Sequence, residues 1–150
     1  MSQVSRREGD FPAVDASLHS EEAVEAALEE DGTAGLERLS GGYALAWRDG
    51  DDVVLARDLL GIKPLFYTLE PFAFASQKES LEGGKELHPR QILRYDTAAE
   101  EARFEQRPFF DVDEQERAVE DAADEVVDLL LTAVDRRVDE PAALLFSGGL

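Results

Sequence analysis

The stretch Leu39–Tyr67, LSGGYALAWRDGDDVVLARDLLGIKPLFY, decides the fold of this chain. Within it, Tyr43–Trp47 is apolar at every position, a pattern typical of a short strand covered on both faces. Asp49-Gly50 is a strong hairpin signal, and Asp52–Arg57 (DVVLAR) is the returning strand. The stretch therefore predicts a β-hairpin at its centre.

Two more apolar runs follow the hairpin. They are Pro64–Thr68 (PLFYT) and Phe72–Ser76 (FAFAS), and the turn-like segment between them contains Pro71. Short runs bounded by turn residues are typical of strands. The sequence therefore predicts four antiparallel strands in a row, which together form a strand meander.

Helical segments are predicted ahead of these strands. Ser20 is a suitable N-cap for a helix that ends at Gly32, with acidic residues in its first turn and apolar residues on one face. A second, short helical piece covers Thr33–Leu39. Residues 1–19 show no periodicity, and we expect them to form a leader or a frayed edge.

The remainder of the chain holds one more hairpin, a helix and a strand. Gln91–Tyr95 and Ala102–Gln106 predict a last, more exposed hairpin. Asp113–Glu116 fits a capping box that opens a long amphipathic helix ending near Arg137. Ala142–Phe146 (AALLF) is then predicted to be a buried strand of the parallel type.

The composition is strongly acidic and contains no cysteine. Of the 150 residues, 34 are Asp or Glu and 15 are Lys or Arg, which gives a formal net charge of -19. Such a surface repels the phosphates of nucleic acids and of anionic membranes, so neither is expected as a partner. It is also typical of a halophile-like protein, because concentrated salt screens the self-repulsion. Without cysteine, the chain can form no disulfide, thiolate metal site or thiol nucleophile.

The sequence also favours a cytoplasmic location. No run of apolar residues is long enough to cross a membrane, and the polar amino-terminal residues do not form a signal peptide.

The candidate ATP-binding residues lie at the end of the chain. There the predicted strand, which includes Leu145, runs into a loop of Ser147, Gly148 and Gly149. Glycines let backbone N–H groups approach an anion closely, and the serine hydroxyl adds a donor. In an α/β unit, a phosphate binds at this position.

A second motif is the corner that holds Arg57, Asp58, Gly61 and Pro64 between two predicted strands. We interpret this motif as structural. Its Asp58 carboxylate is expected to accept backbone N–H bonds, and Gly61 is expected to take a positive φ.

No catalytic residue and no metal ligand is predicted. His19 and His88 are isolated in polar surroundings and are interpreted as loop histidines. Metal ligands must converge on one point, whereas acidic clusters along helices and turns point outward. Three such clusters are therefore interpreted as solvated faces: Glu29–Asp31, Asp49–Asp52 and Glu114–Glu125.

The sequence resembles the glutamine-hydrolysing asparagine synthetases over roughly Leu36–Leu150. Three segments carry this resemblance, in the family's order: Leu39–Tyr67, Phe72–Leu81 (FAFASQKESL) and Leu144–Leu150 (LLFSGGL). In that family, a glutaminase domain of the Ntn type precedes an ATP-pyrophosphatase (PP-loop) synthetase domain. The resemblance implies an α+β fold.

Three parts are expected on this basis. A leader and first helix occupy 1–35, and a partial Ntn-hydrolase-like, glutamine amidotransferase-like meander occupies 36–110. The beginning of the α/β ATP-pyrophosphatase domain occupies 111–150.

The resemblance further implies an ATP-dependent carbon–nitrogen ligase that amidates aspartate through an acyl-adenylate. The family's Ser-Gly-Gly-x-Asp-Ser loop holds the pyrophosphate of ATP, and Ser147–Leu150 match its first four positions. ATP and Mg are thus the implied cofactors, and ATP, aspartate and ammonia the implied substrates. A homodimer is a candidate assembly. The 150 residues alone are expected to be inactive and to lack measurable ATP affinity.

The chain departs from the family at its amino terminus. The family's mature chain begins with Cys, whereas this one begins Met1-Ser2-Gln3, and the family's earlier glutaminase segments have no evident counterpart before Leu36. Glutamine hydrolysis is therefore not expected: either the protein uses free ammonia, or this part of the chain serves only to dock and support the synthetase domain.

Two alternatives remain open at this point. One is a non-catalytic remnant that binds a partner, and the other is a related ligase acting on another carboxylate, as in the β-lactam synthetases. Reading the coding DNA past codon 150 discriminates the ligase from the remnant, because only a ligase frame continues with Asp-Ser and a further domain.

Overall fold

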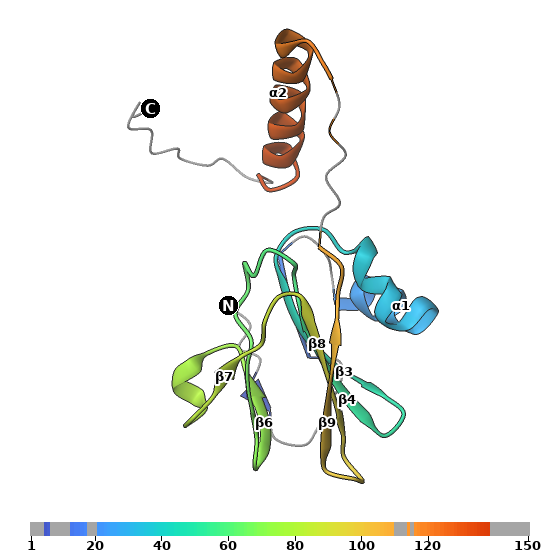
Figure 1. Ribbon diagram of the computed structural model, residues 1–150, viewed down its shortest axis with the longest axis vertical. Helices are drawn as coiled ribbons and strands as arrows, with labels where there is room; N and C mark the ends of the chain where they lie inside the picture. Colours follow the sequence, from blue (N-terminus) through green and yellow to red (C-terminus); the bar gives the residue numbers. More distant parts are fainter. Residues whose placement is uncertain (1–4, 7–12, 18–20, 110–113, 115, 139–150) are drawn as a thin grey trace. The chain divides into compact units, whose positions relative to one another are not determined.

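A computed structural model describes residues 5–6, 13–17, 21–109, 114 and 116–138 of the chain (Figure 1). The chain divides into two units, Met1–Phe110 and Asp111–Leu150. None of the helices in the described part is long and apolar enough to span a membrane.

A five-stranded antiparallel sheet forms the larger layer of the first unit. Its strand order is β2-β3-β4-β8-β9. The strands are β2 (Ala13–Ala16), β3 (Tyr43–Asp49), β4 (Asp52–Arg57), β8 (Gln91–Asp96) and β9 (Glu101–Gln106). The β3–β4 and β8–β9 hairpins confirm the two that the sequence predicts. Contrary to the prediction, β8 is not exposed, because it lies between β4 and β9.

A second antiparallel sheet has the order β1-β6-β5-β7. Its strands are β1 (Ser5–Arg6), β5 (Phe66–Leu69), β6 (Phe72–Ala75) and β7 (Lys85–Glu86), and the short 3-10 helix η2 (Lys78–Ser80) follows β6. The predicted single meander is therefore wrong, since β4 pairs with β8 and β5 pairs with β6 and β7. The corner after Arg57 takes the chain out of one sheet and into the other.

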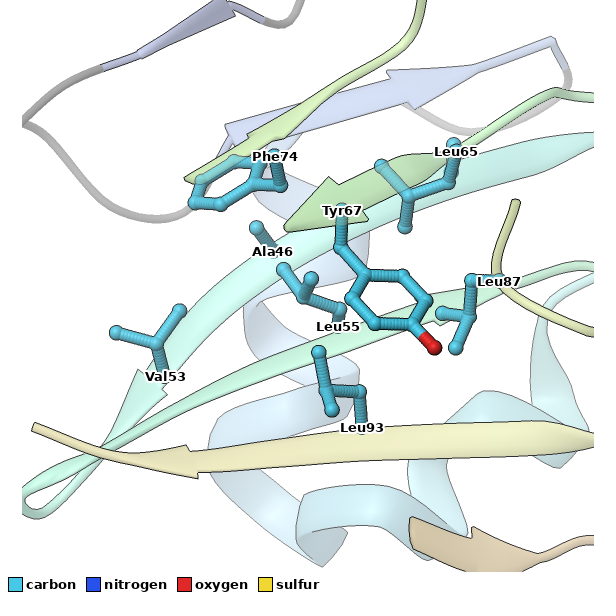
Figure 2. Close-up of a cluster of buried hydrophobic side chains, with 9 residues drawn as sticks. Ala46, Val53, Leu55, Leu65, Tyr67, Phe74, Leu87 and Leu93 are labelled. Atoms are coloured by element: carbon cyan, nitrogen blue, oxygen red, sulfur yellow. The ribbon is translucent and has the colours of Figure 1, made fainter. Parts of the chain in front are cut away.

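Apolar side chains from both sheets form one core (Figure 2). The five-stranded sheet presents small residues such as Ala44 and Ala46 to this core, so that larger side chains of the other sheet can pack on them. Tyr67 of β5 and Phe74 of β6 provide these larger side chains, together with Leu65, which immediately precedes β5. At the edge of the core, the rings of Phe72 and Tyr95 stack with centroids 3.8 Å apart.

A second core lies on the opposite face of the five-stranded sheet. There Val24 and Leu28 of α1 (Glu21–Asp31), together with Leu36 of the 3-10 helix η1 (Gly32–Arg38), pack against Leu45 and Trp47. Alternate residues of β3 thus enter alternate cores. This arrangement confirms the prediction that Tyr43–Trp47 is covered on both faces.

The expectation that residues 1–19 form a leader or frayed edge is wrong for the part that is described. Ser5–Arg6 pairs with β6, and Ala13–Ala16 pairs with β3 along four residues. With α1 against the sheet, the chain before residue 36 contributes to the same unit as the chain after it. A strand of four half-buried residues at a sheet edge lacks the strict alternation by which strands are recognised.

The described part of the second unit centres on α2 (Val119–Asp135). The helix was predicted to open with a capping box at Asp113–Glu116, but it begins at Val119 after Ala118, which makes no side-chain cap. Instead, Glu120 and Asp121 place negative charge in the first turn, where the helix dipole favours it. The predicted strand Ala142–Phe146 lies outside the described residues.

Candidate functional site

The carboxylate of Asp58 organises the corner that follows β4. Its Oδ1 accepts the Ile62 N–H at 2.9 Å, and its Oδ2 accepts those of Lys63 at 3.0 Å and Tyr43 at 3.3 Å. The backbone N–H of Asp58 in turn donates to the Tyr43 carbonyl at 2.9 Å. This geometry agrees with the structural interpretation of Asp58, because backbone donors surround a carboxylate that is only 3% exposed.

Arg57 lies beside Asp58 in the sequence and bonds to different parts of the chain. Its Nη1 donates to Glu86 Oε1 at 2.6 Å and to the Leu87 carbonyl at 3.2 Å, and its Nη2 donates to the Gly61 carbonyl at 2.7 Å. The guanidinium therefore ties the corner to the segment that enters β8. Since the side chain is 3% exposed, Glu86 supplies the carboxylate that a buried cation requires.

Arg107, which follows β9, completes a buried network with the same corner. Its Nη1 donates to the Arg57 carbonyl at 2.7 Å, and its Nη2 donates to the Tyr43 hydroxyl at 3.0 Å. Burial raises the pKa of Tyr43, and the neighbouring Arg107 opposes that shift. The phenol is thus held neutral and hydrogen-bonded at the centre of the network.

Gly61 and Pro64 shape the remainder of the corner. Gly61 has a φ of +68°, and a Cβ at this position would lie 2.9 Å from Pro89 Cγ and 3.3 Å from Arg57 Nη2. Pro64 immediately precedes the fully buried Leu65. Between them, Lys63 Nζ reaches Asp15 of β2 at 2.9 Å, which ties the loop to the sheet edge.

The hydrogen bonds of this corner are made within the protein. The three N–H groups that donate to Asp58 and the three oxygen atoms that accept from Arg57 all belong to the protein, and Arg57 Nε is buried without a hydrogen-bond partner. A general base or a ligand-binding cation needs an available polar atom that is directed at the substrate. The corner instead holds the ends of β3, β4 and β8 together.

Two hollows lie on the α1 side of the five-stranded sheet. One of about 270 Å³ lies beside the corner, where Leu59, Ile92 and Arg107 line it. The other, of about 550 Å³, is lined by Glu25 and Glu29 of α1 and by Trp47 and Asp49 of the β3–β4 hairpin. Within the described part of the chain, no group of three or more acidic or histidine side chains is placed to hold a metal ion.

The remaining residues singled out from the sequence are not brought to the corner. The candidate ATP-binding residues Leu145, Ser147, Gly148 and Gly149 lie outside the described residues, as does His19. His88 is exposed, and its Nδ1 accepts the Arg90 backbone N–H at 3.1 Å.

Sequence reasoning missed Arg107 as a member of the buried network and Glu86 as the exposed partner of Arg57. Arg107 follows an exposed strand, and Glu86 belongs to a two-residue strand, so neither lies in a local pattern that signals burial. Both contacts join residues more than 25 positions apart, and only the tertiary fold brings them together.

Comparison with known proteins assigns a domain type to the first unit. Residues 12–83 match a family described as "Glutamine amidotransferase domain". The match begins ahead of Leu36, where the resemblance was expected to begin, and it includes β2, α1 and the whole corner. This part of the chain is therefore similar to glutamine amidotransferase domains.

Solved structures show a distant likeness. Glutamine phosphoribosylpyrophosphate (PRPP) amidotransferase from B. subtilis, complexed with ADP and GMP, is 16% identical, with a TM-score of 0.47 over 69% of this chain and 31% of that one. A structure titled the allosteric regulatory enzyme of purine biosynthesis is 20% identical, with a TM-score of 0.46 over 57% of this chain and 20% of that one. The chain thus spans about a third or less of the length of these structures. No curated protein matches the sequence.

Proposed function

We propose that this chain is part of an asparagine-synthetase-type ligase that takes its nitrogen from free ammonia. The proposal rests on one observation: a glutamine amidotransferase-like domain at residues 12–83 occurs in a sequence of 150 residues without cysteine. In the family that the sequence resembles, a cysteine thiol attacks the glutamine amide. None of the 150 residues can supply such a thiol.

The described contacts support a scaffolding role for the amidotransferase-like unit. Asp58, Arg57 and Arg107 are each committed to contacts inside the protein. A corner with its charges satisfied in this way stabilises the two sheets. The atoms that make these contacts are not available to bind glutamine.

The ligase part of the proposal rests on the sequence. Ser147, Gly148 and Gly149 would hold the pyrophosphate portion of ATP through backbone N–H groups and the serine hydroxyl. With Mg bound, ATP would convert the carboxylate of aspartate to an acyl-adenylate with release of pyrophosphate, and ammonia would then displace AMP. Another carboxylate acceptor, as in the β-lactam synthetases, would use the same loop.

The test uses the product of the intact reading frame that encodes these residues. With aspartate, ammonium and MgATP, we expect AMP and asparagine to form in equal amounts. Ser147→Ala should slow AMP formation, whereas Thr132→Ala, a matched change of an exposed hydroxyl on α2, should not. If AMP forms only with another carboxylate substrate, the protein is still a ligase but aspartate is not its substrate. If AMP forms with no carboxylate, the proposal is overturned.

A second candidate is a non-catalytic protein that binds a partner. The observation favouring it is α2, whose large apolar residues are exposed along its length. The AMP assay also discriminates this candidate, because a binding protein turns over no ATP.

A further inference from the structure

Arg107 is a buried cation that lacks a carboxylate partner among the described residues. The residue is only 8% exposed, and its guanidinium donates to two neutral oxygen atoms, the Arg57 carbonyl at 2.7 Å and the Tyr43 hydroxyl at 3.0 Å. Arg57, by contrast, pairs with the carboxylate of Glu86. Hydrogen bonds to neutral acceptors satisfy donors but do not neutralise the charge, and a buried charge is costly unless it is paired.

The guanidinium of Arg107 retains donors for a further acceptor. It has more N–H bonds than its two contacts use, and it makes no other hydrogen bond within the described part of the chain. The Asp58 carboxylate belongs to the same network, but its oxygen atoms accept three backbone N–H groups. An additional carboxylate beside Arg107 would therefore find both an opposite charge and available donors.

A hollow of about 270 Å³ lies against this side chain. Arg107 lines it together with four apolar residues, Ala34, Leu59, Ile92 and Pro108. All the residues that line it belong to the first unit. Volumes of about 300–1,000 Å³ are typical of small-molecule sites, so this hollow is suited to a small ligand with an apolar part.

Two carboxylates at the same hollow restrict the kind of anion that it can accept. Glu105 lines the hollow, and its Oε1 accepts a hydrogen bond from Arg94 Nε at 2.6 Å. Glu37 of η1 also lines it, is exposed, and makes no ion pair with any described residue. Glu37 repels a simple anion, whereas it attracts a ligand that carries an ammonium group as well as a carboxylate.

We propose that this hollow binds a small α-amino acid with an apolar side chain. The carboxylate of the ligand pairs with Arg107 and neutralises the buried cation, and the ammonium group pairs with Glu37. The side chain of the ligand contacts Leu59 and Pro108, which line the hollow. The proposal does not depend on the ligase function, because every residue that it uses lies in the first unit.

Calorimetric titration of the full 150-residue chain with L-leucine tests the proposal. We expect saturable binding in the millimolar range. Isoamylamine, which is leucine without the carboxylate, should bind about tenfold more weakly, and isocaproate, which is leucine without the ammonium group, about fivefold more weakly. Absence of leucine binding would overturn the proposal, as would an equal or higher affinity for either analogue.

Two pairs of variants show whether leucine occupies this hollow. Ala34→Phe narrows the hollow without removing a contact of Arg107, and it should weaken leucine binding about tenfold. Ala99→Phe, at an exposed turn position, should change it less than about twofold. Glu37→Gln should weaken the binding of leucine about fivefold but not that of isocaproate, and the exposed Glu82→Gln should affect neither. Equal effects within either pair would contradict the proposed site.

Unfolding experiments keep the test decisive if Arg107→Met is less stable. Trp47, the one tryptophan of the chain, lies in the core of the first unit, so its fluorescence shows whether each variant keeps that unit folded. A ligand that binds only the folded state raises the urea midpoint. Leucine should therefore raise the midpoint of the natural chain and leave that of Arg107→Met unchanged. A rise of the same size in both would overturn the role of Arg107 in binding.

Discussion

The Nη1 atom of Arg107 donates a hydrogen bond to the main-chain carbonyl of Arg57 at 2.7 Å, across 50 positions of sequence. Through this bond and the one to Tyr43, the end of β9 is fastened to the corner that joins the two sheets. These two hydrogen bonds explain how the charged side chain of Arg107 can be buried, with Arg107 only 8% exposed.

Replacing Arg107 by Met should therefore destabilise the first unit. The substitution leaves the Arg57 carbonyl and the Tyr43 hydroxyl without a donor in a buried site, and such losses cost about 1–3 kcal/mol each. Urea unfolding followed by Trp47 fluorescence measures the effect. Arg103→Met is the control, since that side chain is 65% exposed, and equal effects of the two would refute the role given to Arg107.

Asp58→Asn should destabilise the corner by about 2 kcal/mol. The amide keeps one acceptor oxygen but turns an N–H₂ group toward backbone donors that the carboxylate accepts. Asp51→Asn, at an exposed turn position, is the matched control and should change the free energy of unfolding by less than about 0.5 kcal/mol. A neutral Asp58→Asn variant would show that the corner is held by other contacts.

Gly35→Ala tests the close packing of η1 on α1. A Cβ at Gly35 would lie 2.1 Å from the Ala27 carbonyl oxygen, so the two helices would have to separate. We expect a loss of about 1–3 kcal/mol in thermal or urea unfolding. Gly50→Asn is the control, because nothing lies within 4 Å and asparagine tolerates the positive φ of +63°. Unchanged stability of Gly35→Ala would mean that η1 does not pack this closely.

Asp96 provides a prediction for pH. The backbone N–H groups of Ala99 and Ala98 both donate to its Oδ1 at 2.9 Å, and these bonds lower the pKa of the carboxyl group. Because the folded pKa lies below the unfolded one, the contribution is present above the unfolded value and is lost as the pH falls through the folded value. Asp96→Ala should therefore lower the urea midpoint at pH 7, and the difference from the natural chain should narrow in acid. A difference that widens in acid would contradict this assignment.

Salt should stabilise the folded chain. The net charge of -19 favours expansion, and raising the salt from 0.1 M to 1 M shortens the Debye length from about 10 Å to about 3 Å. Screening also weakens the ion pairs of Arg94 with Asp49 and Glu105, but these are few beside the excess of acidic side chains. We expect the Tm to rise with KCl, and a fall would show that the ion pairs outweigh the self-repulsion.

Local sequence patterns predicted the hairpins and the helix α1, and they failed at long-range pairing. The β3–β4 hairpin could be predicted because its turn is specified by two adjacent residues, Asp49 and Gly50. The residues near Arg57 contain no pattern that predicts the pairing of β4 with β8 rather than with β5. That pairing depends on a sheet assembled from distant segments of the chain. At the site, the role of Asp58 was predictable because two of its three donors, Ile62 and Lys63, follow it within five positions. Arg107 was not, since its partners lie 50 and 64 positions away.

The origin of the product nitrogen tests most directly the claim that the amidotransferase-like domain is retained as a scaffold. The product of the intact reading frame would be supplied with MgATP, aspartate and either ¹⁵N-ammonium or glutamine labelled in its amide nitrogen, and asparagine and glutamate would be followed by mass spectrometry. We predict that asparagine acquires the label from ammonium, and that neither labelled asparagine nor glutamate forms from glutamine. Release of glutamate with transfer of the amide label to asparagine would contradict the central claim.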